Sequence, residues 1–116
     1  MPSFDMRYDS RDDVLEVFFG EESRRSRTVK LSTNVAVTVD ERMEVVEGLV
    51  LYDYSRLLRV GEVELNGLDD LDEVESDLLL TLLMTWPVTC FLLLAAAETP
   101  LARVTSPNVQ DLVSEP

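Results

Sequence analysis

The sequence predicts an α+β fold, in which a small antiparallel sheet or meander of about five strands is followed by C-terminal helical elements. Two observations carry this prediction. Residues 1–60 contain five short segments with strand-like patterning at roughly ten-residue spacing, typical of an antiparallel sheet. Residues 71–97 combine a helical pattern with an apolar run. Residues 78–97 hold no charge, whereas the other 96 residues carry all 33 charged side chains.

Charge divides the chain near Gly61. Residues 1–60 hold 12 acidic and 9 basic side chains, and residues 61–116 hold 11 acidic side chains and one basic side chain. We therefore expect a β-sheet module over 1–60 and an acidic C-terminal region over 61–116, with an apolar helical segment at 71–97 and a polar tail. The net charge of −13 disfavours binding to nucleic acid and to anionic lipid.

The first two elements are predicted to be strands joined by a turn. Phe4, Met6 and Tyr8 alternate with charged residues, which is the period of a half-buried strand. Residues 9–12 are rich in the Asp and Ser side chains that form turns. The second strand, at 14–19, places three apolar side chains on one face: Leu15, Val17 and Phe19.

Three further strands and one helical turn complete the predicted sheet module. Residues 28–31 form a short third strand, and a fourth strand, at 35–39, lines one face with valines. A fifth strand is expected over 45–51. Residues 54–58 are predicted to form a helical turn, and its two leucines, Leu57 and Leu58, are expected to pack on the sheet.

Residues 6–58 resemble the DUF2283 family of small bacterial and archaeal proteins. The resemblance rests on Arg7-Tyr8-Asp9, Asp13-Val14-Leu15, residues 35–40, Gly48-Leu49-Val50-Leu51, Asp53 and Ser55. It implies a compact, self-associating β-sheet module, and it brings no established active residues. Two departures concern the hairpin before the fifth strand. The family usually has a glycine in this turn, whereas this chain has Arg42-Met43-Glu44 and is one residue longer there. Glu47 stands where the family usually has an apolar residue.

The chain offers little for catalysis. It has no histidine, which removes the commonest general base and the commonest zinc ligand. Cys90, the single cysteine, lies in the apolar run without a basic neighbour, so we expect a buried packing residue. We therefore predict a protein that is not an enzyme, with no catalytic residue, no cofactor and no metal site.

Two acidic clusters are interpreted as structural. Asp9, Asp12 and Asp13 can offer oxygen ligands to a divalent cation, but their spacing lacks the glycine and the terminal glutamate of an EF-hand loop. We interpret them as turn-forming side chains on a solvated edge. We interpret the second cluster as the start of a helix near Leu71, and not as a cation site. Carboxylates are favourable there because the first N–H groups of a helix are unpaired. Its members are Asp69, Asp70, Asp72, Glu73, Glu75 and Asp77.

One basic patch occurs, and we interpret it as a solvated hairpin loop. It consists of Arg24, Arg25, Arg27 and Lys30, the sole lysine. Arginine suits phosphate recognition, so an acidic-partner site is the alternative. The acidic neighbours Glu21 and Glu22 favour the solvated loop.

The apolar run at 78–97 is long enough to cross a bilayer, which takes about 20 residues. However, its flanks are acidic, and no Lys or Arg lies within about 15 residues upstream to set an orientation. Pro87 is expected to divide the run into a helix of about 15 residues and a second apolar segment at 88–97. The expected buried stripe of the helix consists of Leu71, Val74, Leu78 and Leu82. These features favour burial against the sheet or a partner subunit.

The sequence therefore predicts a non-enzymatic cytoplasmic protein that binds or self-associates. We expect a homo-oligomer, or a protein partner held through residues 78–97, and no nucleic acid. One alternative is a β module with a membrane tail anchor at 78–97. Another is a small antitoxin-like regulatory partner, whose acidic surface masks a basic target.

Overall fold

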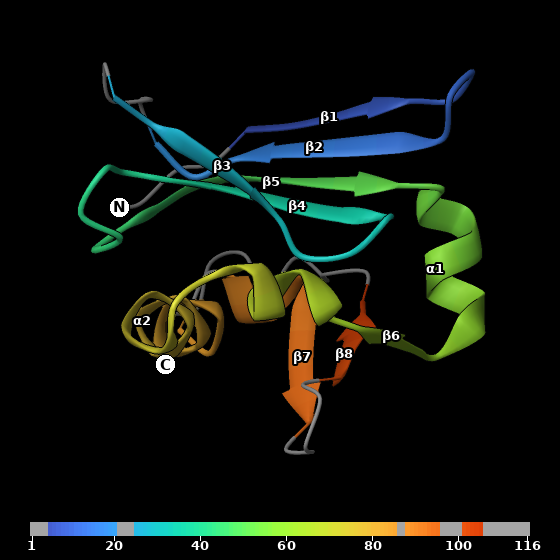
Figure 1. The fold of residues 1–116 in the computed structure, drawn as a ribbon. Coiled ribbons are helices and arrows are strands. Elements are labelled where there is room, and N and C mark those ends of the chain that lie inside the picture. The colour runs from blue at the N-terminus through green and yellow to red at the C-terminus, as the bar shows by residue number, and fades with distance from the viewer. Residues whose placement is uncertain (1–4, 21–24, 86–87, 96–100, 106–116) are drawn as a thin grey trace.

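Two layers make up the fold, one a five-stranded sheet and the other an assembly of helices with a smaller sheet (Figure 1). A computed structural model of the chain describes residues 5–20, 25–85, 88–95 and 101–105. Within them, strands and helices share one hydrophobic core between the layers. The predicted α+β class is confirmed.

The larger sheet contains all five strands predicted for the N-terminal half. They are β1 (Asp5–Asp9), β2 (Val14–Phe18), β3 (Arg27–Lys30), β4 (Val35–Val39) and β5 (Val46–Tyr52). Every neighbouring pair is antiparallel, and the spatial order is β1-β2-β5-β4-β3. The sheet is therefore more than a sequential meander. Strand β5, the last of these five along the chain, lies in the middle of the sheet, between the β1-β2 hairpin and the β3-β4 hairpin.

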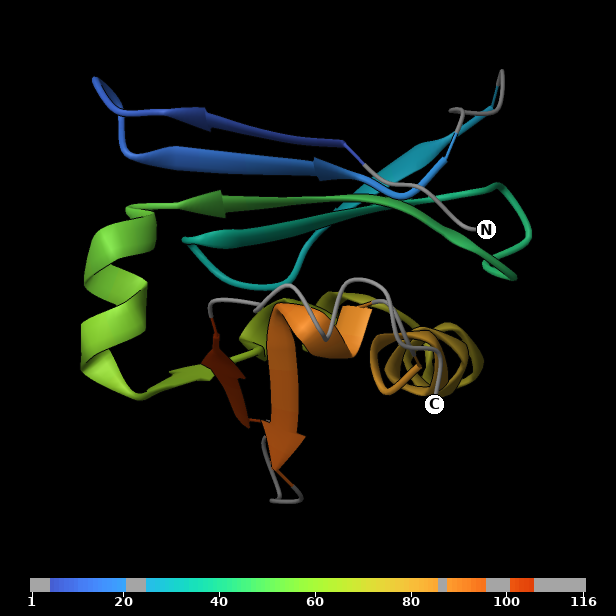
Figure 2. The same ribbon diagram turned by 180° about the vertical axis from the view of Figure 1, so that it is seen from behind.

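The second layer follows β5 along the chain. It comprises α1 (Tyr54–Val60), β6 (Glu62–Glu64), the 3-10 helix η1 (Asn66–Asp70), α2 (Glu73–Leu83), the 3-10 helix η2 (Val88–Cys90), β7 (Leu92–Ala95) and β8 (Leu101–Val104). The three short strands form a second antiparallel sheet in the order β6-β8-β7. Figure 2 shows α1 standing at one end of the large sheet and α2 lying toward the other end.

Residues 71–97 are not helical throughout, so that prediction is wrong. Helix α2 ends at Leu83, and the later part of the apolar run forms η2 and the strand β7. Strand β7 pairs with β8, which lies in the part of the sequence assigned to the polar tail. A strand partner beyond the run is not visible in the pattern of the run itself, because leucine-rich segments suit both helices and buried strands.

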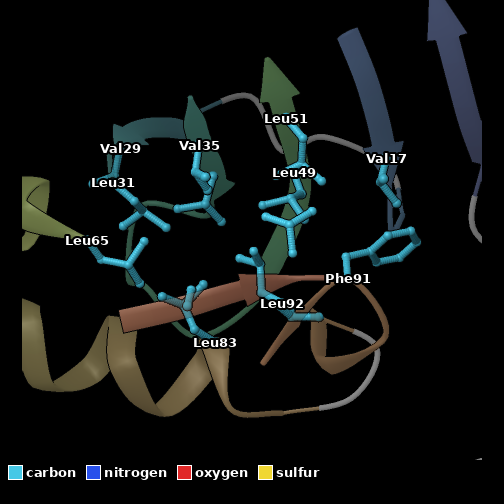
Figure 3. Packing of buried hydrophobic residues seen from close by; sticks show 14 of the residues in the cluster. Val17, Val29, Leu31, Val35, Leu49, Leu51, Leu65, Leu83, Phe91 and Leu92 are labelled. Atoms are coloured by element: carbon cyan, nitrogen blue, oxygen red, sulfur yellow. The ribbon is translucent and has the colours of Figure 1, made fainter. Parts of the chain in front are cut away.

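The apolar run covers the inner face of the large sheet. Figure 3 shows Leu83, Phe91 and Leu92 facing Leu49 and Val17 of the sheet. Six described residues of the run are buried: Leu79, Leu83, Val88, Cys90, Phe91 and Leu92. Within the described parts of the chain, no helix combines the length and apolar character needed to cross a membrane.

A close backbone contact fixes the second layer against the sheet. The N–H of Gly67 in η1 donates to the carbonyl oxygen of Leu31, at the end of β3, over 2.8 Å. A Cβ atom on Gly67 would overlap the Lys30 carbonyl oxygen. Only glycine permits this approach without moving the backbone.

The buried face of α2 differs from the predicted stripe. Leu79 and Leu83 enter the core, whereas Val74 and Leu78 are 69% and 45% exposed. The other two predicted stripe residues, Leu71 and Leu82, are half-buried. Leucines occur on several faces of this helix, so periodicity alone does not select the face that meets the sheet.

Two other predicted contacts with the core are absent. Strand β1 is an edge strand and is exposed along its length, including Met6 and Tyr8, which were expected to be half-buried. Leu57 of α1 is buried as predicted, but Leu58 is exposed. Helix α1 packs against β6 and β8 at the end of the sheet, so only one of the two leucines reaches the core.

Candidate functional site

The outer face of the large sheet has no described helix or strand lying over it (Figures 1 and 2). Directly opposed residues share a face of an antiparallel sheet. One row of opposed residues therefore crosses the outer face from β1 to β3. It runs Arg7, Glu16, Val50, Ala36 and Lys30. We call this outer surface of β1 to β5 the open face.

The open face is apolar at its centre. The outward residues of β5 are Gly48, Val50 and Tyr52, and Ala36 lies beside Val50 on β4. The inward residues of the same strands are also apolar and buried: Val35, Val37, Leu49 and Leu51. A sheet with one face in water normally alternates apolar and polar residues. Strand β5 instead has the composition of a strand that is covered on both faces.

A concavity of about 680 Å³ lies at one end of the open face. Its apolar floor is formed by Val14, Ala36 and Tyr52. The polar groups around this floor are Asp12, Thr28, Lys30, Thr33, Asn34 and Asp53. Asp12 lies on the β2 side, and Lys30 lies on the opposite side, on β3. The concavity therefore has a carboxylate on one side and a cation on the other.

Asn34 holds the end of β5 against the loop between β3 and β4. Its Nδ2 donates to the Tyr52 carbonyl oxygen at 3.2 Å and to Asp53 Oδ2 at 3.1 Å. Its own carbonyl oxygen accepts from the Tyr52 N–H at 2.8 Å. Asp53 has a left-handed backbone with φ of 55°. These bonds fix a backbone conformation that a residue other than glycine rarely adopts.

Asp13 joins the turn after β1 to the start of α1. Its backbone is also left-handed, with φ of 56°. Its carbonyl oxygen accepts from the Tyr54 N–H at 2.9 Å, and its carboxylate accepts from the Ser55 N–H at 3.1 Å and the Ser55 hydroxyl at 2.6 Å. The helix's own N-cap residue, Asp53, makes no capping bond with its side chain. Asp13 therefore supplies the cap from a distant turn.

Tyr8 completes this cluster of hydrogen bonds. Its hydroxyl donates to Asp13 Oδ1 at 2.6 Å. The hydrogen bonds from Ser55 and Tyr8 hold the pKa of the Asp13 carboxyl below its usual value, and the charge of Arg59 acts in the same direction. The bond to Asp13 is the main cause of the raised Tyr8 pKa. Both shifts move titration away from neutral pH, so this pair is poorly suited to proton transfer.

The resemblance to DUF2283 involved several residues of this region. Tyr8, Asp13, Asp53 and Ser55 are separated in the sequence, but they gather at the end of the sheet where α1 begins. Their hydrogen bonds connect β1, β2, β5 and α1. In this chain, these four polar residues have a structural role.

The acidic residues of the first turn behave as interpreted from the sequence. Asp9 Oδ1 accepts from the N–H groups of Arg11 and Asp12, at 2.9 and 3.4 Å. Asp13 is bonded as described above, while Asp12 borders the concavity. Across the described parts of the chain, no three His, Cys, Asp or Glu side chains are arranged to hold a metal ion.

The second acidic cluster marks the start of α2, as predicted. Asp72 is the N-cap, and its carboxylate accepts from the Glu75 N–H at 2.7 Å. Glu73 and Glu75 occupy the first turn, where the helix dipole favours negative charge. The helix begins at Glu73, two residues after the predicted Leu71.

The predicted basic patch does not form one site. Arg25 lies 3.6 Å from Glu41, and Arg27 forms an ion pair with Glu75 of α2 at 2.5 Å. Lys30 lies at the concavity, and Arg24 lies outside the described residues. Exposed Arg25 agrees with a solvated loop, whereas Arg27 and Lys30 belong to strand β3. Two of the cations are paired with carboxylates of this chain, and the acidic-partner alternative stays a prediction.

The hairpin before β5 contains the residues that depart from the DUF2283 pattern, Arg42-Met43-Glu44. Met43 has a left-handed backbone with φ of 54°, yet its side chain is buried at 4% exposure. The Asp40 carboxylate accepts from the Glu44 and Val45 N–H groups, and these bonds hold its pKa low. The pairing of β4 with β5 shifts register after Thr38.

Glu47 and Cys90 both lie inside the protein. Glu47, which replaces an apolar residue of the family pattern, is buried at 5% exposure. Cys90 is buried in the core, as predicted for a packing residue.

Sequence reasoning missed the open face. Its signal was present in β5, where Gly48, Val50 and Tyr52 interrupt the expected alternation. The cross-strand row cannot be read from the sequence, because it depends on the register of four strand pairs. No protein family, curated protein or solved structure matches the chain, so the resemblance to DUF2283 stays a prediction.

Proposed function

We propose that the protein is a non-enzymatic binding module that acts in the cytoplasm as a homodimer, with the open face as the contact between its copies. One observation carries this proposal. The central strands have apolar or small residues on both faces. On the side over which no described helix or strand lies, Val50 is half-buried and Ala36 is 7% exposed. Association that covers this side removes apolar surface from water.

The charges at the concavity favour a second copy as the occupant. Lys30 and Asp12 lie on opposite sides of the concavity. In a two-fold symmetric contact, each pair of touching residues occurs twice, with the roles of the copies exchanged. A two-fold axis placed midway between these two positions brings Lys30 of each copy near Asp12 of the other. The same surface is therefore complementary to itself in both apolar character and charge.

The size of the open face predicts a weak dimer. Five strands about 4.8 Å apart, each about five residues long, cover roughly 24 by 17 Å. Two such faces bury roughly 800 Å² in total, below the about 1,000 Å² expected of a stable specific interface. The net charge of −13 on each copy also opposes association. We expect a dissociation constant in the micromolar range.

Sedimentation equilibrium tests the proposal. The wild-type mass should rise with concentration toward twice 13.1 kDa. Val50→Lys should keep the chain monomeric, because it places a charge at the centre of the open face. Val60→Lys is the matched control, since Val60 is 51% exposed on α1, away from this face. Circular dichroism verifies that both variants fold. Equal self-association of the two variants would exclude the open face as the contact between copies.

Residues 78–97 offer a second surface for association. Six described residues of the run are buried in the core, but Leu78, Met84 and Leu93 are exposed. Leu93→Lys separates the two surfaces in the same experiment. If it abolishes the dimer while Val50→Lys does not, the contact lies on the apolar run and the open-face proposal fails.

A further inference from the structure

Helix α2 carries a second uncovered apolar surface, independent of the open face. We propose that this surface docks a basic amphipathic helix of a partner protein. It consists of Val74, Leu78 and Leu82, spaced four residues apart, and we call it the α2 stripe. The proposal does not rest on the homodimer, because the α2 stripe belongs to the other layer of the fold.

The apolar surface of α2 exceeds what the core uses. Leu79 and Leu83 are buried in the core, and Leu80 and Leu82 are partly buried against it. Val74 and Leu78 nevertheless remain 69% and 45% exposed, and Leu82 is half-buried. Residues at i, i+4 and i+8 lie on one side of a helix, so the three form a continuous strip. A helix that is apolar beyond its core contact has the composition of one packed on two sides.

The charges beside the α2 stripe determine the kind of partner. By helical geometry, Glu73 and Asp77 lie along one flank and Glu75 lies along the other. Residues 61–116 contain 11 acidic side chains and only one basic side chain, Arg103. An acidic partner or an anionic lipid surface is repelled by this region, whereas a basic partner is attracted.

Within the fold itself, one arginine already binds a carboxylate of this helix. The Arg27 guanidinium reaches from the edge strand β3 to the Glu75 carboxylate at 2.5 Å. A partner helix with arginines beside an apolar stripe can make the equivalent contact with Glu73 and Asp77 on the other flank.

The length of α2 limits the contact. Its 11 residues span about 16 Å, or about three turns. The matching partner is a helix of similar length with apolar residues at i, i+4 and i+7, flanked by Arg or Lys. This chemistry also fits the regulatory alternative predicted from sequence, in which an acidic surface masks a basic target.

A synthetic peptide serves as the probe. It contains only Leu, Ala and Arg, with the leucines on one face of a three-turn helix, and it carries a fluorescent label for anisotropy titration. The protein is the Val50→Lys variant, which keeps the open face out of the measurement. We expect saturable binding that the double variant Val74→Gln, Leu78→Gln weakens about tenfold, as for loss of central apolar anchors. The matched control replaces two exposed apolar residues elsewhere, Val45→Gln and Leu58→Gln, and should leave the affinity unchanged.

Two results would overturn the proposal. A peptide of the same composition in scrambled order tests simple charge attraction. If it binds as tightly as the amphipathic peptide, or if the double variant keeps full affinity, the α2 stripe is not the docking surface. Sedimentation of the double variant without the Val50→Lys change tests whether the α2 stripe binds a second copy of the chain. A loss of self-association there would assign the α2 stripe to a contact between copies. The two peptide results do not bear on the open face, which is tested by Val50→Lys. Loss of self-association in the α2 double variant, with Val50→Lys still dimeric, would instead count against the open face as the contact between copies.

Discussion

The two faces of the large sheet use the same strands in different ways. On the inner face, Val17, Leu49 and Val37 lie opposite one another and are almost fully buried. On the outer face, the neighbouring row places Val50 and Ala36 between charged residues, with no described element above them. The inner row is apolar because the second layer packs on it. The centre of the outer row is apolar although no described element packs on it, and our proposal is that a second copy covers it.

Adjacent residues of β5 give the largest expected contrast. Leu49→Ala should lower the free energy of unfolding by about 3 kcal/mol, because it leaves a cavity in the core. Val50→Ala, one residue later on the outer face, should cost less than about 1 kcal/mol but weaken self-association. Urea denaturation measures the first quantity and sedimentation the second. Equal losses of stability would show that the two faces are not distinct.

A glycine substitution probes the docking of the second layer on the sheet. Gly67→Ala should destabilise the fold by about 2 kcal/mol, because the added methyl group forces the backbone away from Lys30. Gly20→Ala is the matched control, since a Cβ there meets no atom within 4 Å. Thermal unfolding compares the two variants. If Gly67→Ala has the melting temperature of the control, the close contact between η1 and the end of β3 is contradicted.

The smallest expected effect concerns the end of the sheet. The pKa of Asp13 is lowered in the folded state, so its ionised form adds stability above the unfolded pKa, about 4. That stability is lost as the pH falls toward the folded pKa. Asp13→Asn should therefore melt several degrees below wild type at pH 7, and the gap should narrow below about pH 4. Melting curves over this range test it, and a gap independent of pH would contradict the assigned role.

The N-terminal half was largely predictable because its signals are local. The alternation of apolar and polar residues located the strands, and Val35, Val37 and Val39, predicted to line one face, are all buried. The order of the strands was not predictable, because β5 pairs with β2 across an intervening hairpin. Non-local pairing of this kind leaves no periodic trace in the sequence.

The C-terminal half was predicted less well because its leucines do not favour one structure. Residues 71–97 are predicted as an apolar helical segment that Pro87 divides. Only the pairing with β8 shows that Leu92–Ala95 is a strand. The start of α2 was nearly correct because capping is local, as the Asp72 bond shows. The open face, which carries the proposed function, required the register of the whole sheet.

Charge exchange between two positions tests the homodimer most directly. In the proposed two-fold contact, residue 30 of one copy meets residue 12 of the other. Lys30→Asp puts two carboxylates together at this contact, and Asp12→Lys puts two ammonium groups together. We predict that each variant alone sediments as a monomer of about 13.1 kDa. An equal mixture should restore a species of twice this mass, because both contacts then pair opposite charges. Monomers in the mixture, or wild-type association of either variant alone, would contradict a dimer through the open face.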